Sequence, residues 1–217
     1  MSVVVAVRKN GRAAIAADSQ IMSGSAIISS KYLAHYSKIH SFEDSFIGLV
    51  GAVSMSAVFK SLLSRHAPKL DFHNAFYIFE ASRKLHKILI DEYHINPQNY
   101  GENEVECSHL NALIVNARGV FSLEEDRSVI EWTRFAAIGC GSSLALGAMH
   151  ALYDRCDDPE AIAKAGVEAA CEFDPGCGLP VDCWSVAMAP IAEMLVVGGN
   201  GDHKPRVAGT GTLSTRG

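Results

Sequence analysis

Residues 2–20 read SVVVAVRKNGRAAIAADSQ, and this stretch decides the fold at the start of the chain. Residues 3–7 are apolar and mostly β-branched, which indicates a strand buried on both faces. Asn10-Gly11 predicts a two-residue hairpin turn, because a type I′ turn needs positive φ at both central residues. The return strand covers residues 12–17. This register sets Asp18 opposite Val3 and therefore brings an acid beside the chain start.

The bulk composition bounds the class of protein. The chain has 217 residues, of which 48% are hydrophobic and 20% are charged, and this suits a single globular domain. The formal net charge of −5 argues against a nucleic-acid partner, which would need clustered Lys and Arg. We find no secretory signal and no apolar run long enough to cross a membrane, so we expect a cytoplasmic protein with no membrane partner.

The rest of the chain predicts alternating blocks of strands and helices. Residues 21–37 are expected to form a loose connection. In the second helix we expect Phe76, Phe79 and Leu85 on the buried side, together with Ile88 and Leu89. Blocks of each type favour an α+β fold packed in layers. Strands are expected at residues 38–42, 45–50, 110–115, 119–123, 128–132, 135–138, 184–189 and 193–197, and helices at 54–66, 71–93, 142–153 and 159–173.

Ser2 is a candidate nucleophile once the initiator Met1 is removed. By itself a serine at this position is uninformative, because many inert proteins lose Met1 before a small residue. A terminal serine does carry a hydroxyl and an amine, whose ordinary pKa of about 7.7–8.0 lets it accept the hydroxyl proton. Such a site also needs a cation, an acid that holds the cation, and a backbone donor for the oxyanion.

The runs 3–11 and 15–20 resemble the start of bacterial HslV peptidases and proteasome β subunits. The resemblance places Ser2 on the catalytic Thr of that family and Asp18 on its acid. It implies a four-layer α-β-β-α sandwich of the N-terminal-nucleophile hydrolase type. The peptidase domain is then expected over residues 2–198, followed by a tail rich in Gly, Thr and Ser over 199–217.

Further motifs follow in the family's order. Lys38, with Ile39 and Phe42 behind it, resembles the catalytic Lys, although a longer gap after Asp18 leaves Lys31 as a rival. Gly48 begins a Gly-x-x-Gly signature, and the resemblance implies that its N–H forms the oxyanion hole.

Two cysteines occupy positions at which the family has serine. Cys140 stands in a Gly-Cys-Gly run before the third helix, where the family's serine helps to shuttle the proton. Asp174 opens a run that resembles Asp-x-x-Ser-Gly, with Cys177 in place of the serine. A thiol is a weaker hydrogen-bonding group than a hydroxyl. These replacements resemble a divergent bacterial branch, the betaproteobacterial proteasome homologue, more than HslV itself.

Strict strand alternation raises a difficulty for Asp18. It puts the Asp18 side chain on the face of Val3, opposite to that of Ser2. Either Asp18 reaches Lys38 from that face, or the strand contains a bulge.

The resemblance also suggests a substrate pocket lined by Met22, Phe46 and Val50. Phe46 would partly fill the pocket floor and favour small side chains at the position preceding the cleaved bond. The alternative is that Phe46 packs in the core.

The sequence predicts no metal and no cofactor. Histidine spacing matches no metal motif, and no dinucleotide fingerprint is present. The six cysteines lack any CxxC pair, so we expect free thiols. A zinc site from Cys171, Cys177 and Cys183 was the alternative, but that spacing matches no common pattern.

Three functions remain open. The first is a self-compartmentalising peptidase that cleaves unfolded polypeptides, built as two stacked rings, with a tetradecamer favoured over a dodecamer and an ATP-dependent unfoldase as a candidate partner. The second is a small-molecule amidase of the same fold. The third is a catalytically weak ring-forming scaffold.

Overall fold

The computed structural model describes residues 2–34, 36–97 and 105–190, in which two antiparallel sheets lie face to face. The first sheet consists, in spatial order, of β10 (Phe135–Gly139), β1 (Val3–Lys9), β2 (Arg12–Asp18) and β11 (Val181–Ala187). The second consists of β5 (Ile39–Phe42), β6 (Ser45–Val50), β7 (Asn111–Asn116), β8 (Gly119–Leu123) and β9 (Val129–Trp132).

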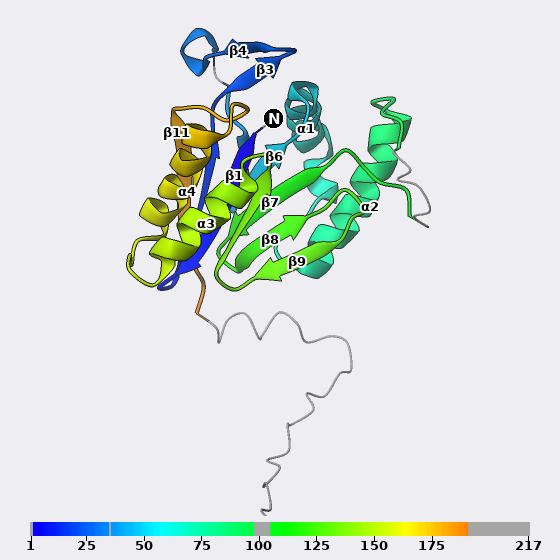
Figure 1. The fold of residues 1–217 in the computed structure, drawn as a ribbon. Helices are drawn as coiled ribbons and strands as arrows, with labels where there is room; N and C mark the ends of the chain where they lie inside the picture. The colour runs from blue at the N-terminus through cyan, green and yellow to red at the C-terminus, as the bar shows by residue number, and fades with distance from the viewer. Residues whose placement is uncertain (1, 35, 98–104, 191–217) are drawn as a thin grey trace, which may run out of the picture.

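Two helices cover the outer face of each sheet (Figure 1). On the first sheet lie α3 (Ser142–Tyr153) and α4 (Pro159–Phe173). On the second lie α1 (Val53–His66) and α2 (Ala75–Asp91). The layers therefore follow the order α-β-β-α, which confirms the expected sandwich. Among the described residues, no helix is both long enough and apolar enough to span a bilayer.

Strand β1 is buried on both faces, as its unbroken apolar run predicts. Val3, Val5 and Val7 pack with residues of α3 and α4 in one core cluster. Val4 and Ala6 point the other way and pack between the sheets, in a cluster that includes strands of the second sheet. A central position in the first sheet thus explains why polar residues are absent from β1 until its end.

The N-terminal hairpin has the predicted register. Asn10 and Gly11 have φ values of 50° and 70°, as a type I′ turn requires. The strands pair from Lys9–Arg12 up to Val4–Ala17, so that Asp18 follows opposite Val3. Helix α4 also begins as predicted, because the Asp158 side chain accepts a hydrogen bond from Glu160 N–H and Pro159 occupies the first turn.

The connection over residues 21–37 holds structure that the sequence did not predict. Strands β3 (Ile21–Ser23) and β4 (Ala26–Ile28) form a small hairpin, with Gly24 at a φ of 60° in its turn. Figure 1 shows this hairpin projecting beyond the ends of both sheets. Strands of three residues are too short to display an alternating pattern, so sequence alone could not distinguish them from a loop.

The buried face predicted for α2 was partly wrong. Phe76 and Phe79 are exposed, whereas Ile78, Leu85 and Leu89 are buried. The true apolar stripe passes through Ile78 and continues at helical spacing through Ala81 to Leu85 and Leu89. The prediction chose the wrong face because Phe76 and Phe79 are large and apolar, although they lie on the face next to the buried stripe.

Two predictions for the last part of the chain differ in outcome. The strand expected at 184–189 is present at Val181–Ala187. The strand expected at 193–197 and the tail at 199–217 lie outside the described residues, so the proposed domain boundary stays a prediction.

Gly48 should be intolerant of a side chain because the two sheets meet there. A Cβ at this position would lie 2.5 Å from Val4 Cγ1 and 3.0 Å from Ile15 Cδ1. We expect Gly48→Ala to lower the free energy of unfolding by about 1–3 kcal/mol, measured by urea denaturation. Gly147→Ala on α3, where nothing lies within 4 Å, is the control and should not destabilise the fold. Equal stability of the two variants would contradict the described sheet packing.

Candidate active site

Ser2 lies at the start of the central strand β1 and is buried. The residue after it, Val3, pairs with Gly139 at the end of β10, so Gly139 lies beside the Ser2 carbonyl. Gly139 has a φ of 95°, and a Cβ there would lie 2.2 Å from the Ser2 carbonyl oxygen. Only glycine combines this backbone conformation with so close an approach. The sheet thus fixes the backbone of the candidate nucleophile.

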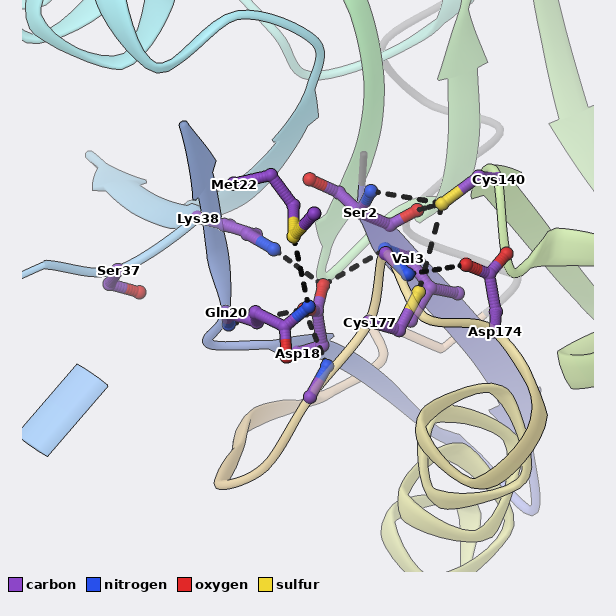
Figure 2. A network of polar contacts seen from close by, with 12 residues as sticks. Ser2, Val3, Asp18, Gln20, Met22, Ser37, Lys38, Cys140, Asp174 and Cys177 are labelled. Carbon is purple, nitrogen blue, oxygen red and sulfur yellow. Dashed lines mark hydrogen bonds and ion pairs between the residues drawn. The ribbon is translucent and has the colours of Figure 1, made fainter. Parts of the chain in front are cut away.

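The Asp18 carboxylate is fully buried and accepts four hydrogen bonds (Figure 2). Oδ1 accepts from Val3 N–H at 2.9 Å and from Lys38 Nζ at 2.6 Å. Oδ2 accepts from Gln20 N–H and Gly178 N–H, each at 3.1 Å. Asp18 therefore does reach Lys38 while it also holds the backbone next to Ser2, which resolves the question that strand alternation had raised.

Lys38 is the cation of the site. It is 3% exposed and comes directly before β5, whereas Lys31 is exposed and lies over the Tyr32 ring, 5.1 Å from its centroid. The structure thus pairs Lys38, and not the rival Lys31, with Asp18. A buried ammonium needs such a partner, because an isolated charge would be strongly destabilising in the interior.

Cys140 contacts the backbone of Ser2 on the other side. The Ser2 nitrogen donates to Cys140 Sγ at 3.2 Å, and the Cys140 thiol donates to the Ser2 carbonyl at 3.4 Å. Cys177 Sγ is 3.9 Å from Cys140 Sγ. Burial raises the pKa of the Cys177 thiol, and the negative charge of Asp18 raises it further, so Cys177 is a neutral thiol at neutral pH.

The Asp174–Gly178 segment closes the site. Asp174 Oδ1 accepts from Gly176 N–H at 2.7 Å, which shapes the turn. Gly178 donates to Asp18, and the Gln20 side chain donates to the Pro175 carbonyl at 2.8 Å. The segment after α4 is therefore fastened to the residues after β2, although about 155 positions separate them in the chain.

The structure argues against the role predicted for Gly48. Leu49 N–H donates to the Lys38 carbonyl at 2.9 Å, so these two form a hydrogen-bonded pair and the next residue on β6, Gly48, is directed toward β7. There Gly48 pairs with Leu113. Its N–H thus belongs to the sheet ladder, and contact with Val4 accounts for the need for glycine at this position.

The end of β6 lies beside Gly139, which also packs against the Ser2 carbonyl. A Cβ at Gly139 would lie 3.1 Å from Val50 Cγ1 as well as against the Ser2 carbonyl. Gly51 follows Val50 directly, is exposed and has a φ of 120°. Gly51, the second glycine of the Gly-x-x-Gly signature, therefore lies at the exposed end of β6, whereas Gly48 lies within the strand.

The three predicted pocket residues lie in different surroundings. Met22 Sδ accepts from the Gln20 side chain at 3.5 Å and so joins the Asp18 network (Figure 2). Val50 lies against Gly139 beside Ser2. Phe46 stacks on Trp184 with ring centroids 5.4 Å apart and packs with the cluster between the sheets. The pocket role of all three stays a prediction.

Sequence reasoning missed two residues near Asp18. One is hydrogen-bonded to Asp18, and the other is affected by its charge. Gln20 binds both Asp18 and the closing segment, and its place two residues after an acid at a strand end was the available signal. Tyr36 is half-buried, and burial followed by the charge of Asp18 raises the pKa of its hydroxyl. It lies in the connection where the sequence showed no pattern.

The cysteines suspected of binding zinc do not form one group. Within the described ranges, the set of ligand atoms close enough to hold a metal comprises Cys140, Asp174 and Cys177. Burial raises the pKa of Cys171 and of Cys183 to about 11, which fits inert thiols. All six cysteines are free, as expected from their spacing.

The four-layer α-β-β-α architecture is the fold of N-terminal-nucleophile hydrolases. The buried Asp18–Lys38 pair lies next to the start of β1, where this class has its active site. A family model described as "Proteasome subunit" matches residues 2–171, and the chain belongs to this family. None of the curated proteins compared with the chain matches it.

Solved structures agree with the suspected branch. Thiobacillus denitrificans BPH is 34% identical, with a TM-score of 0.82 over 87% of this chain and 99% of that chain. Thiobacillus denitrificans BPH in complex with epoxomicin is 36% identical, with a TM-score of 0.77 over 87% and 100%. Eukaryotic HslV from Trypanosoma brucei, at 17% identity and a TM-score of 0.59 over 84% and 98%, supports the fold alone. The resemblance inferred from the sequence is confirmed.

Loss of Lys38 should destabilise the protein, because it would leave the Asp18 carboxylate buried without its counter-ion. We expect Lys38→Met to lower the free energy of unfolding by about 3–5 kcal/mol in urea denaturation at neutral pH. Adding Asp18→Asn should restore part of this loss. Lys31→Met, at an exposed position, is the matched control. A stability of Lys38→Met equal to that of the control would show that the pair is not energetically coupled.

Proposed function

We propose that this chain is a peptidase whose nucleophile is the Ser2 hydroxyl, released for catalysis when Met1 is removed. The observation that carries this proposal is the buried Asp18–Lys38 pair, whose carboxylate also binds the N–H of the residue next to Ser2. The relative found in complex with epoxomicin supports a peptidase rather than another use of the fold.

The chemistry follows from the groups around Ser2. The freed α-amine takes the proton from its own hydroxyl, and Oγ attacks the carbonyl carbon of the scissile bond. The Lys38 ammonium lowers the proton affinity of the amine and stabilises negative charge on Oγ. The protonated amine then gives its proton to the leaving nitrogen as the C–N bond breaks. Water hydrolyses the resulting ester, with the same amine as base, and Oγ regains its proton.

Two further groups assist in this proposal. Gly51, rather than Gly48, supplies the backbone N–H for the oxyanion, since it lies at the open end of β6 beyond Val50. Cys140, which contacts both the nitrogen and the carbonyl of Ser2, takes the place of a hydroxyl that relays the proton between amine and nucleophile. Cys177 Sγ, which lies 3.9 Å from Cys140 Sγ, and the nearby Asp174 carboxylate help to hold the Cys140 thiol in place.

Self-association is part of the proposal. Exposed large apolar side chains occur on the outer helices, with Leu144 and Leu146 on α3 and Phe173 at the end of α4. Contiguous exposed apolar surface marks sites that a partner covers, and we propose that these side chains belong to such a surface. We propose two stacked rings of this subunit in the cytoplasm, with a tetradecamer favoured, which act on unfolded polypeptides and receive them from an ATP-dependent unfoldase.

Replacement of the nucleophile tests the function directly. We expect Ser2→Ala to lower the hydrolysis of fluorogenic peptides by about 10⁴-fold or more, whereas Ser2→Thr keeps measurable activity. A peptide epoxyketone should form an adduct at residue 2 of the wild type, detected by mass spectrometry after N-terminal sequencing has verified the loss of Met1. Ser143→Ala, an exposed change on α3, is the control.

The outcomes separate the alternatives. Hydrolysis of simple amides without hydrolysis of peptides would favour the small-molecule amidase. A processed chain that forms no adduct would favour the scaffold. A particle that sizes as a stable monomer would contradict ring formation.

The thiol at position 140 should limit the rate. Because a hydroxyl is the stronger hydrogen-bonding group, we expect Cys140→Ser to raise kcat several-fold and Cys140→Ala to lower it. Steady-state kinetics at fixed pH measures both, with Cys183→Ser as the control. An unchanged kcat in Cys140→Ala would exclude a proton relay through this side chain.

A further inference from the structure

Two thiols and a carboxylate converge beside Ser2 (Figure 2). The ligand atoms of Cys140, Asp174 and Cys177 all lie within 4.8 Å of one another. They come from two separate parts of the chain, the end of β10 and the segment after α4. Cys177 is buried and Cys140 is exposed, so the group has a buried side and a solvent-facing side from which an ion can reach it.

The spacing fits a tetrahedral zinc ion. With a Zn–S distance of about 2.3 Å, two sulfurs on a tetrahedral zinc lie about 3.8 Å apart. The measured Cys140–Cys177 sulfur separation is 3.9 Å. Two thiolates with one carboxylate oxygen form a donor set that suits zinc better than magnesium or calcium, which prefer oxygen alone.

A fourth ligand is available once Met1 is gone. The Ser2 nitrogen lies 3.2 Å from Cys140 Sγ, and on tetrahedral zinc a nitrogen and a sulfur lie about 3.6 Å apart. With respect to Cys140, the α-amine of the processed chain is therefore within a few tenths of an ångström of the separation that a shared zinc ion requires.

The charges near the site favour a dication. Asp174 is one of the proposed ligands and supplies one negative charge, and the Asp18 carboxylate, which binds the N–H of Gly178 next to Cys177, supplies another nearby. The Lys38 ammonium opposes a cation but is engaged by Asp18 at 2.6 Å. Zinc would displace the thiol protons as it binds.

We propose that Cys140, Cys177 and Asp174, joined by the α-amine of Ser2 in the processed chain, form a zinc site that reversibly blocks the nucleophile. Zinc bound to the amine occupies the lone pair that would otherwise accept the hydroxyl proton. The binding of zinc depends on these three side chains and the α-amine and not on peptidase activity, whereas its inhibitory effect rests on the proposed peptidase function.

Metal binding is tested without any measurement of activity. The processed, reduced full-length protein is titrated with Zn²⁺ in competition with a chromophoric chelator, and with Co²⁺ to detect a thiolate-to-metal charge-transfer band. We expect one site per chain and at least a ~100-fold weaker affinity in Cys140→Ser and in Cys177→Ser. Asp174→Asn should also weaken binding. Cys171→Ser and Cys183→Ser are matched controls that should bind as the wild type does.

Two results would overturn the site itself. One is a wild type that binds Zn²⁺ no more tightly than the Cys140→Ser/Cys177→Ser double variant, with circular dichroism verifying that both are folded. The other is the loss of binding in Cys171→Ser or Cys183→Ser instead.

Inhibition is measured separately with a fluorogenic peptide. Zn²⁺ should abolish hydrolysis by the wild type, EDTA should restore it, and Cys140→Ser should be at least ten times less sensitive. Binding without inhibition would overturn the block on the nucleophile. If Zn²⁺ binds but no variant hydrolyses peptide with or without EDTA, the proposed function fails and the metal site stands. Hydrolysis without Zn²⁺ binding refutes the metal site alone.

Discussion

The buried ion pair between Asp18 and Lys38 is the constraint on which the rest of the site depends. A carboxylate with no exposed surface is stable only if its oxygens are satisfied, and donors from Val3, Gln20, Lys38 and Gly178 meet this need. The same bonds fix the backbone after Ser2 and the closing segment at Gly178. Stability and chemistry therefore rest on the same group, and the positions of the other site residues follow from it.

Much of the fold could be predicted because several signals agreed locally. The apolar run of β1, the Asn10-Gly11 turn and the Asp158-Pro159 helix start each have a direct physical cause and a clear pattern. The register of the first hairpin then placed Asp18 opposite Val3 without any knowledge of the fold. Lys38 was preferred through its match to the motif, and its burial against Asp18 supplies the physical reason.

The failures have other causes, and most of them depended on contacts between elements. The short hairpin β3–β4 has too few residues to show a period. Phe76 and Phe79 are large and apolar, yet the direction in which α2 packs is decided by its partner sheet. The sequence could assign a role to Gly48 but could not show that its N–H is directed toward the neighbouring strand β7. Likewise, the resemblance placed Cys140 and Cys177 at one site, but it could not show that their sulfurs lie 3.9 Å apart.

The bond from Gly178 to Asp18 has a consequence for biosynthesis. Its two ends are 160 positions apart, so the ribosome must complete nearly the whole domain before the acid acquires its full set of partners. A half-made chain can form the first hairpin, but the carboxylate remains hydrated and the closing segment does not yet exist. The full set of donors to Asp18 can therefore form only after residue 178 has been synthesised.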